Sequence, residues 1–134
     1  MTVDVWQFYE TLSDETRQNL SEAQRAVAAI CDWRQEVSSG GFDSYFRYWG
    51  GNTAATAVAA LPEALGSEWA GLLREGVALF GPEYPTEPDR RGAVLDGLDL
   101  EDRLEQMDAR FFELEAALDA DARLGEFLAR DGLT

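Results

Sequence analysis

Residues 36–49 read EVSSGGFDSYFRYW, in which a glycine pair is followed by eight residues, five of them aromatic. Two adjacent glycines accept backbone angles that other residues avoid, so we expect the incoming helix to end there and the chain to reverse. The aromatic residues then recur at i, i+3, i+4 and i+7, which places them on one face of a short helix. Such a face buries a large apolar area, and we predict that other helices pack onto it. Its members are Phe42, Tyr45, Phe46 and Trp49.

Hydrophobic spacing on the N-terminal side of this stretch predicts two helices. Residues 5–12 fit a short amphipathic helix. Ser21 and Gln24 resemble a capping box, in which each side chain binds a free backbone amide of the first turn. From there an apolar pattern runs to the glycine pair. Cys31 lies beside this pattern, and we interpret it as a small, partly buried residue, because the chain has no histidine to activate a thiol.

The C-terminal side begins with an alanine-rich segment, residues 53–61, which favours a helix. We expect Pro62 and Gly66 to interrupt it. Ser67 is a good N-cap for the helix that follows. Residues 81–92 hold three of the four prolines and predict a mobile loop.

The last third of the chain predicts the longest helix and a shorter one that ends near Gly132. No stretch shows the alternation of a strand. We therefore predict an all-α fold, a compact bundle of six or seven helices forming a single domain over residues 1–134. The apolar stripe of the long helix is Leu100, Leu104, Met107, Phe111, Leu114 and Leu118, and that of the final helix is Leu124, Phe127 and Leu128.

The chain is strongly acidic. It has 26 acidic residues against 11 basic ones, all arginine, for a formal charge of −15. Residues 81–134 hold 15 of the acids and six of the arginines. A charge of this sign repels nucleic acid and anionic membranes and attracts basic partners, although it also serves solubility alone. Without a signal peptide or a long apolar run, the sequence predicts a cytoplasmic protein with no membrane segment.

The residue types that are missing exclude several kinds of chemistry. With no histidine, no lysine and one cysteine, the chain has no Ser-His-Asp triad, Walker A lysine or thiolate zinc cluster. The acidic run 96–102 is not an EF-hand loop, because Leu98 would be its third residue and Glu101 would replace the glycine required at the sixth. We predict no catalytic residue, no metal and no cofactor, and hence a non-enzymatic protein.

The long predicted helix also carries a line of acids beside its apolar stripe. Residues four apart lie about 6 Å apart along the axis, and the whole line spans roughly 27 Å. This spacing is comparable with that of phosphates along a nucleic-acid strand, so a phosphate-binding protein is a candidate partner. An ordinary solvated helix face is the alternative interpretation. The candidate partner-binding residues are Glu101, Glu105, Asp108, Glu115 and Asp119.

The central stretch resembles the signature of a bacterial domain family whose best-known member is a DNA-mimic protein. In that family a helix ends in an Asn-Gly-Gly-Phe-like corner followed by paired aromatics. Ser39 stands where asparagine is usual, and residues 47–49 depart from the small and polar residues expected there. The similarity is good over about residues 20–81 and looser over the acidic helical part, 95–131. The matching corner residues are Gly40, Gly41, Phe42, Tyr45 and Phe46, to which we assign a structural role.

The resemblance implies an all-helical fold. For the DNA-mimic member it also implies an acidic surface that occupies the DNA-binding face of a transcription factor, with a homodimer presenting the charges. Our leading hypothesis is accordingly a protein that presents an acidic face to a basic nucleic-acid-binding protein, without binding nucleic acid itself. Two alternatives remain open. One is an immunity or antitoxin protein that neutralises a basic toxin, and the other is an enzyme or small-molecule binder with a pocket near Tyr45, Tyr48, Trp49 and Trp69.

Overall fold

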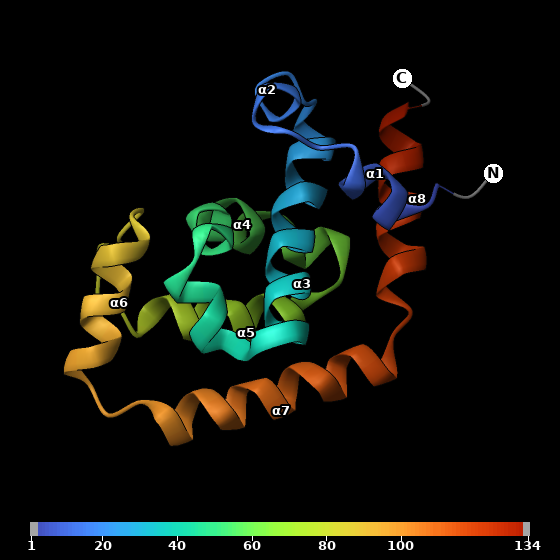
Figure 1. Ribbon diagram of the computed structural model, residues 1–134. Helices are drawn as coiled ribbons and strands as arrows, with labels where there is room; N and C mark the ends of the chain where they lie inside the picture. Colours follow the sequence, from blue (N-terminus) through green and yellow to red (C-terminus); the bar gives the residue numbers. More distant parts are fainter. Residues whose placement is uncertain (1–2, 133–134) are drawn as a thin grey trace.

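The computed structural model describes residues 3–132, which form eight α-helices, one 3₁₀ helix and no strand (Figure 1). The all-α prediction is confirmed, with one or two more helices than expected. None of these helices combines the length and apolarity that a membrane span requires. The elements are α1 Val5–Glu10, α2 Asp14–Arg17, α3 Glu22–Arg47, η1 Trp49–Thr53, α4 Ala54–Ala64, α5 Ser67–Ala78, α6 Pro88–Gly97, α7 Glu101–Ala117 and α8 Ala120–Gly132.

Helix α3 runs through the middle of the molecule and bends sharply at the glycine pair. Its predicted capping box is present, because Ser21 N–H donates to Gln24 Oε1 at 3.0 Å and Gln24 N–H donates to Ser21 Oγ at 3.1 Å. The break lies at Gly41, whose φ of 79° and ψ of 178° are not helical. A side chain there would also collide with Asp108, because an added Cβ would lie 2.5 Å from its Oδ2. The helix therefore changes direction at the predicted place.

Aromatic rings from α3, α5 and α7 form the centre of the core. Trp33 is fully buried, and its ring meets those of Phe42, Trp69 and Phe111 edge-on at centroid distances of 6.1, 6.1 and 5.3 Å. In Figure 1, α7 lies along the lower edge beneath α3 and α5, and α8 turns upward beside α1. The T-shaped contacts add to the area buried by each ring. This core fixes α7 against the rest of the bundle.

Trp49 corrects the prediction for the aromatic face. Phe42, Tyr45 and Phe46 are fully buried, but Trp49 is 47% exposed and the adjacent Tyr48 is 61% exposed. The reason is that α3 ends at Arg47, so the helical spacing does not extend to residue 49. Trp49 opens η1 instead.

The exposed Trp49 ring is held by the partly buried side chain of Arg17. The guanidinium of Arg17 lies 4.6 Å from the centroid of the Trp49 ring. Arg17 in turn donates at 2.7 Å to Asp32, which is almost fully buried and also accepts from the hydroxyls of Tyr9 and Thr53. Helices α1 and α2 are thereby joined to α3 and η1.

Two predicted helix boundaries differ from the structure. Helix α4 continues through Pro62 to Ala64, because proline removes a single N–H and Leu65 N–H still bonds to Leu61 O at 2.9 Å. Gly66, with φ of 120°, is the N-cap of α5. Ser67 is the first helical residue and makes no capping bond, so the predicted Ser67 cap is wrong.

The predicted loop at residues 81–92 is also too long, because α6 begins at Pro88. Proline is favoured in the first turn of a helix, where its missing N–H is not needed. Arg91 of α6 is fully buried. Its guanidinium donates to Phe46 O at 2.7 Å, to Tyr48 O at 2.9 Å, and to two further oxygens, Pro85 O and Asn52 Oδ1. A cation among the last carbonyls of α3 is favourable at that helix end, although burial lowers the pKa of Arg91.

Candidate protein-binding surface

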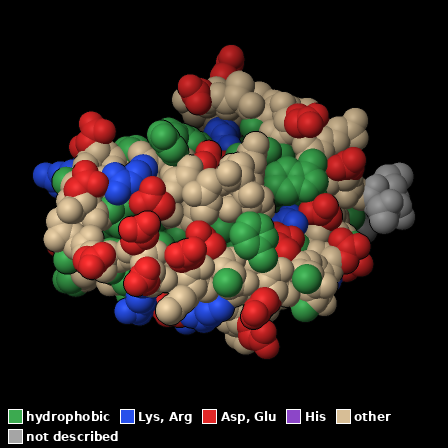
Figure 2. Space-filling view, turned by 60° about the horizontal axis from the view of Figure 1, so that its bottom comes forward, with side chains coloured by type: hydrophobic (Ala, Val, Ile, Leu, Met, Phe, Trp, Pro, Cys, Tyr) green, Lys and Arg blue, Asp and Glu red, His purple; other side chains and the backbone are tan. Residues whose placement is uncertain are grey.

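Helix α7 places four of the five predicted acidic residues along one edge of the molecule. Figure 2, in which the lower edge of Figure 1 comes forward, shows many acidic side chains on this face, with hydrophobic side chains and a few arginines among them. The two ends of α7 differ in what surrounds these acids. The first end faces α6 and the bend of α3, and the second leads into α8.

The first end of α7 borders an open, acid-lined cavity with a volume of about 630 Å³, which we call the acidic hollow. Six of its lining side chains are carboxylates and one is an arginine. Arg47 pairs with two of the acids, at 3.0 Å from Asp43 Oδ2 and 2.9 Å from Asp96 Oδ1. The lining residues are Asp43, Arg47, Leu95, Asp96, Leu98, Asp99, Leu100, Glu101, Leu104, Glu105 and Asp108.

Three carboxylates of the acidic hollow have no partner within the part of the chain that the structure describes. Asp99, Glu101 and Glu105 are all exposed, and none of them makes a hydrogen bond or an ion pair with residues 3–132. Glu101 and Glu105 are one helical turn apart, about 6 Å along the axis. No group of three or more acidic or cysteine side chains in residues 3–132 is arranged to hold a metal ion. The open charges at this end therefore face solvent.

Asp108, at the rim of the acidic hollow, is used by the fold. Its Oδ1 accepts the N–H of Phe42 at 2.7 Å, which joins α7 to the bend of α3. Burial raises the pKa of the Asp108 carboxyl, the Phe42 amide lowers it, and the charges of Asp43 and Glu105 raise it further. The carboxylate satisfies an amide that the glycine bend would otherwise leave free. Asp108 therefore fixes the position of α7 against α3 at the acidic hollow.

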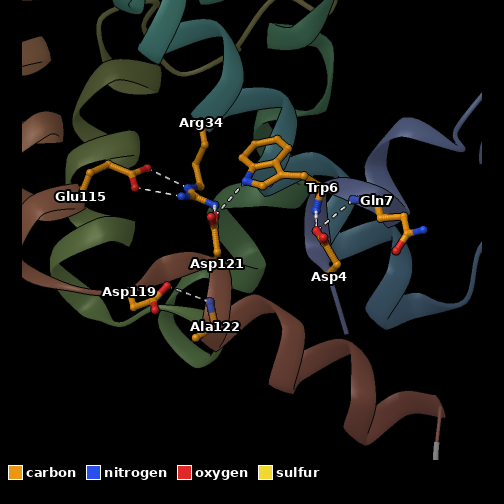
Figure 3. Close-up of polar contacts among 8 residues, drawn as sticks. All are labelled: Asp4, Trp6, Gln7, Arg34, Glu115, Asp119, Asp121 and Ala122. Carbon is orange, nitrogen blue, oxygen red and sulfur yellow. Dashed lines mark hydrogen bonds and ion pairs between the residues drawn. The ribbon is translucent and has the colours of Figure 1, made fainter. Parts of the chain in front are cut away.

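The second end of α7 meets α3, α8 and α1 around one buried cation, in a cluster that we call the Arg34 junction (Figure 3). Arg34 Nε and Nη2 donate to the two carboxylate oxygens of Glu115 at 2.7 and 2.8 Å, and Nη1 donates to Asp121 Oδ1 at 2.8 Å. Trp6 Nε1–H donates to the same Asp121 oxygen at 2.9 Å. Burial lowers the pKa of Arg34, but the bonds and charges of Glu115 and Asp121 outweigh burial and raise it. The Arg34 junction thus neutralises Glu115, one of the acids predicted on an open face, together with Asp121.

Asp119 does not lie on the long helix as predicted. Helix α7 ends at Ala117, and Asp119 lies in the short connection to α8. There its Oδ1 accepts the N–H of Ala122 at 3.0 Å, which caps the first turn of α8. The five predicted residues therefore divide into two groups. Glu101 and Glu105 are open, whereas Asp108, Glu115 and Asp119 have partners inside the protein, and a role in binding a partner stays a prediction for all five.

The corner residues of the resemblance lie next to the acidic hollow without lining it. Phe42, Tyr45 and Phe46 are buried in the core, and Gly40 and Gly41 form the bend. An added Cβ at Gly40 would lie 2.6 Å from the Cβ of Ser44, so this glycine also permits a close approach. These residues place Asp43 and Arg47 at the acidic hollow.

The residues proposed for an aromatic pocket do not share one surface. Tyr45 and Trp69 are buried in the core, whereas Tyr48 and Trp49 are exposed.

Cys31 is fully buried, more than the sequence predicted, and burial raises the pKa of its thiol to about 12. A thiol with this pKa is protonated at neutral pH and is a poor nucleophile.

Sequence reasoning missed Arg34 as the centre of a junction, although a signal was present. Residue 34 lies four residues after Ile30 and three before Val37, in the apolar pattern that leads to the glycine pair, and a charged side chain at a core-facing position requires a partner. The partner Glu115 is 81 residues away, so local spacing did not identify it. Arg91 had no comparable signal, because it lies in a segment that the prolines marked as a loop.

Comparison with known protein families gives a match over most of the chain. No curated protein and no solved structure gives a significant match. A protein family described as DMP19-like protein matches residues 18–131, which include both the glycine bend and the whole of α7. Because this match covers most of the sequence, the chain belongs to the DMP19-like protein family.

Proposed function

We propose that this protein is a non-enzymatic DNA mimic whose acidic hollow and first half of α7 bind the DNA-binding surface of a basic nucleic-acid-binding protein. Membership of the DMP19-like protein family is compatible with this role. The observation that carries the proposal is the set of open carboxylates at one end of α7. Asp99, Glu101 and Glu105 have no partner among the described residues, whereas Asp108 and Glu115, further along the helix, do.

Open acids next to one another favour a binding role because they cost stability. Like charges one helical turn apart destabilise a helix by about 0.2–0.5 kcal/mol per pair. Arg103 and Arg110, on the same helix, reach Glu75 of α5 and so do not neutralise Glu101 or Glu105. A basic partner would offset this repulsion and replace the counterions that the acids attract.

The concave shape of the acidic hollow suits protruding basic side chains. An arginine that binds a phosphate recognises two oxygens in a plane, and a carboxylate presents the same arrangement. Exposed charges also govern the rate of association and its dependence on salt. Binding should therefore weaken steeply as salt rises, because the Debye length falls from about 10 Å at 0.1 M to about 3 Å at 1 M.

The test uses the tagged protein as bait in a lysate of the organism that encodes it, at about 0.1 M and again at about 0.5 M salt, a difference large enough to screen exposed charges. A triple variant, Asp99→Asn with Glu101→Gln and Glu105→Gln, removes the open charges while keeping the shape of each side chain. We expect the wild type to capture a nucleic-acid-binding protein at low salt and the triple variant to lose it.

A matched control carries Glu10→Gln, Glu63→Gln and Glu126→Gln. These three acids are exposed and unpaired within residues 3–132, and they do not line the acidic hollow. The control has the same net charge as the triple variant and should capture as the wild type does. Equal loss in both variants would mean that net charge alone attracts the partner. Capture of a single toxin-like protein would replace mimicry with the immunity function.

A further inference from the structure

One large apolar side chain lies on the acidic side of α7. Position 112 continues the helical spacing of Glu105 and Asp108, but the residue there is phenylalanine. The Phe112 side chain is 49% exposed, whereas the adjacent Phe111 is fully buried. Figure 2 shows hydrophobic side chains among the acidic ones on this face. A row of phosphate groups carries no aromatic ring, so charge mimicry alone does not account for this residue.

The fold holds the Phe112 backbone firmly on both sides. Residues four before and three after a helical position are its neighbours on the helix surface, here Asp108 and Glu115. Asp108 is bound to the bend of α3, and Glu115 is bound to Arg34. The Phe112 ring also meets Phe111 edge-on, with 5.6 Å between ring centroids. A side chain on such a fixed support loses little freedom when it binds, which favours affinity.

We infer that Phe112 is an apolar anchor that inserts into a pocket on the basic partner and so determines which basic protein is bound. This inference rests on the proposed function. Phe112 lies seven positions after Glu105, which corresponds to a rise of about 10 Å along the helix. The partner therefore has an apolar pocket about this far from the arginine or lysine that contacts Glu105. Aromatic anchors surrounded by polar contacts carry much of the energy of protein interfaces, whereas exposed charges act mainly on encounter.

The experiment compares Phe112→Ala with the wild type and with Tyr48→Ala. Tyr48 is a matched control, because it is an exposed aromatic residue outside α7. Two probes are used: a lysate of the source organism, with captured nucleic-acid-binding proteins quantified by mass spectrometry, and poly-arginine. Phe112→Ala should lower capture from the lysate about tenfold, as loss of an interface anchor does. Binding of poly-arginine should not change, because the charge is the same.

Two further measurements show that the effect comes from the ring. Thermal unfolding should be nearly unchanged in Phe112→Ala, because half of the side chain is in solvent. Phe112→Leu keeps an apolar group and should recover part of the capture.

Each contrary outcome has a distinct meaning. Undiminished capture by Phe112→Ala, together with loss in the triple acidic variant, would overturn the anchor and leave the proposed function standing. Equal loss in Tyr48→Ala, or weaker binding of poly-arginine by Phe112→Ala, would also overturn the anchor. If the wild type captures no nucleic-acid-binding protein, both the anchor and the proposed function fail.

Discussion

Acids at the two ends of α7 have different surroundings. At the first end, Glu101 and Glu105 border the acidic hollow and bind nothing in the described chain. At the second end, Glu115 and Asp121 close around Arg34, a buried cation bridging three helices. An acidic sequence pattern therefore has two physical meanings, open surface charge and internal neutralisation. Only the first is available to a partner.

The largest expected effect is at the Arg34 junction. Arg34→Met would leave Glu115 and Asp121 without their shared cation, and removing one member of a buried pair costs about 3–5 kcal/mol. Because the two carboxylates retain some contact with solvent, we expect a loss of about 2–3 kcal/mol in the free energy of unfolding, measured by urea denaturation. Arg103→Met is the control, since its exposed pair with Glu75, at 3.5 Å, should be worth less than about 1 kcal/mol. Equal losses in the two variants would remove the distinction between the ends of α7.

A smaller effect is expected at Asp108, and it depends on pH. Burial raises the pKa of this carboxyl above its ordinary value of 3.8. The folded protein therefore holds the Asp108 proton more tightly than the unfolded chain does, and this contribution to stability is lost as the pH rises through the raised pKa. Asp108→Asn keeps an oxygen that accepts the Phe42 N–H. At neutral pH the free energy of unfolding of this variant should exceed that of the wild type by less than about 1 kcal/mol. Below the ordinary pKa, where Asp108 is protonated in both the folded and the unfolded wild type, the two values should be equal.

The measurement for Asp108 is the free energy of unfolding of both proteins from about pH 3 to about pH 7, the range that spans ordinary carboxyl titration. The difference between them isolates this carboxyl, because the other acids titrate in both. A difference that grows as the pH falls would show that the ionised form is the one favoured by the fold, and would contradict the expected sign.

The smallest effect on stability is expected at the open end. Glu101→Gln with Glu105→Gln removes a repulsion of about 0.2–0.5 kcal/mol and breaks no internal bond. The free energy of unfolding should therefore be unchanged or slightly higher, as measured by thermal denaturation at low salt. A loss above about 1 kcal/mol would mean that these acids have a structural partner, since exposed residues without one rarely reach that value.

Local chemistry in the sequence was sufficient for much of the fold. The glycine bend and the Ser21 capping box follow from backbone angles and neighbouring residues, and both are present. The helical spacing also identified the core side of α7. Trp49 was misplaced because a periodic pattern does not reveal where its helix ends.

The candidate surface was only partly predictable, because spacing alone does not reveal distant partners. Helical period placed Glu101 and Glu115 on the same line, and nothing local distinguishes the two. Their difference arises from Arg34, which reaches Glu115 after the whole bundle has assembled. The exposure of Phe112 likewise depends on which elements pack beside α7. Such features require the tertiary structure.

The most direct test of the central claim is competition with DNA. A labelled duplex is bound to the nucleic-acid-binding protein that the wild type captures, and fluorescence anisotropy follows its displacement. We expect the wild type to displace the duplex, and the Asp99, Glu101 and Glu105 triple variant to fail, while the charge-matched control remains active. Displacement by the triple variant as strong as by the wild type would contradict the account, because the open end of α7 would then not be the surface that replaces DNA.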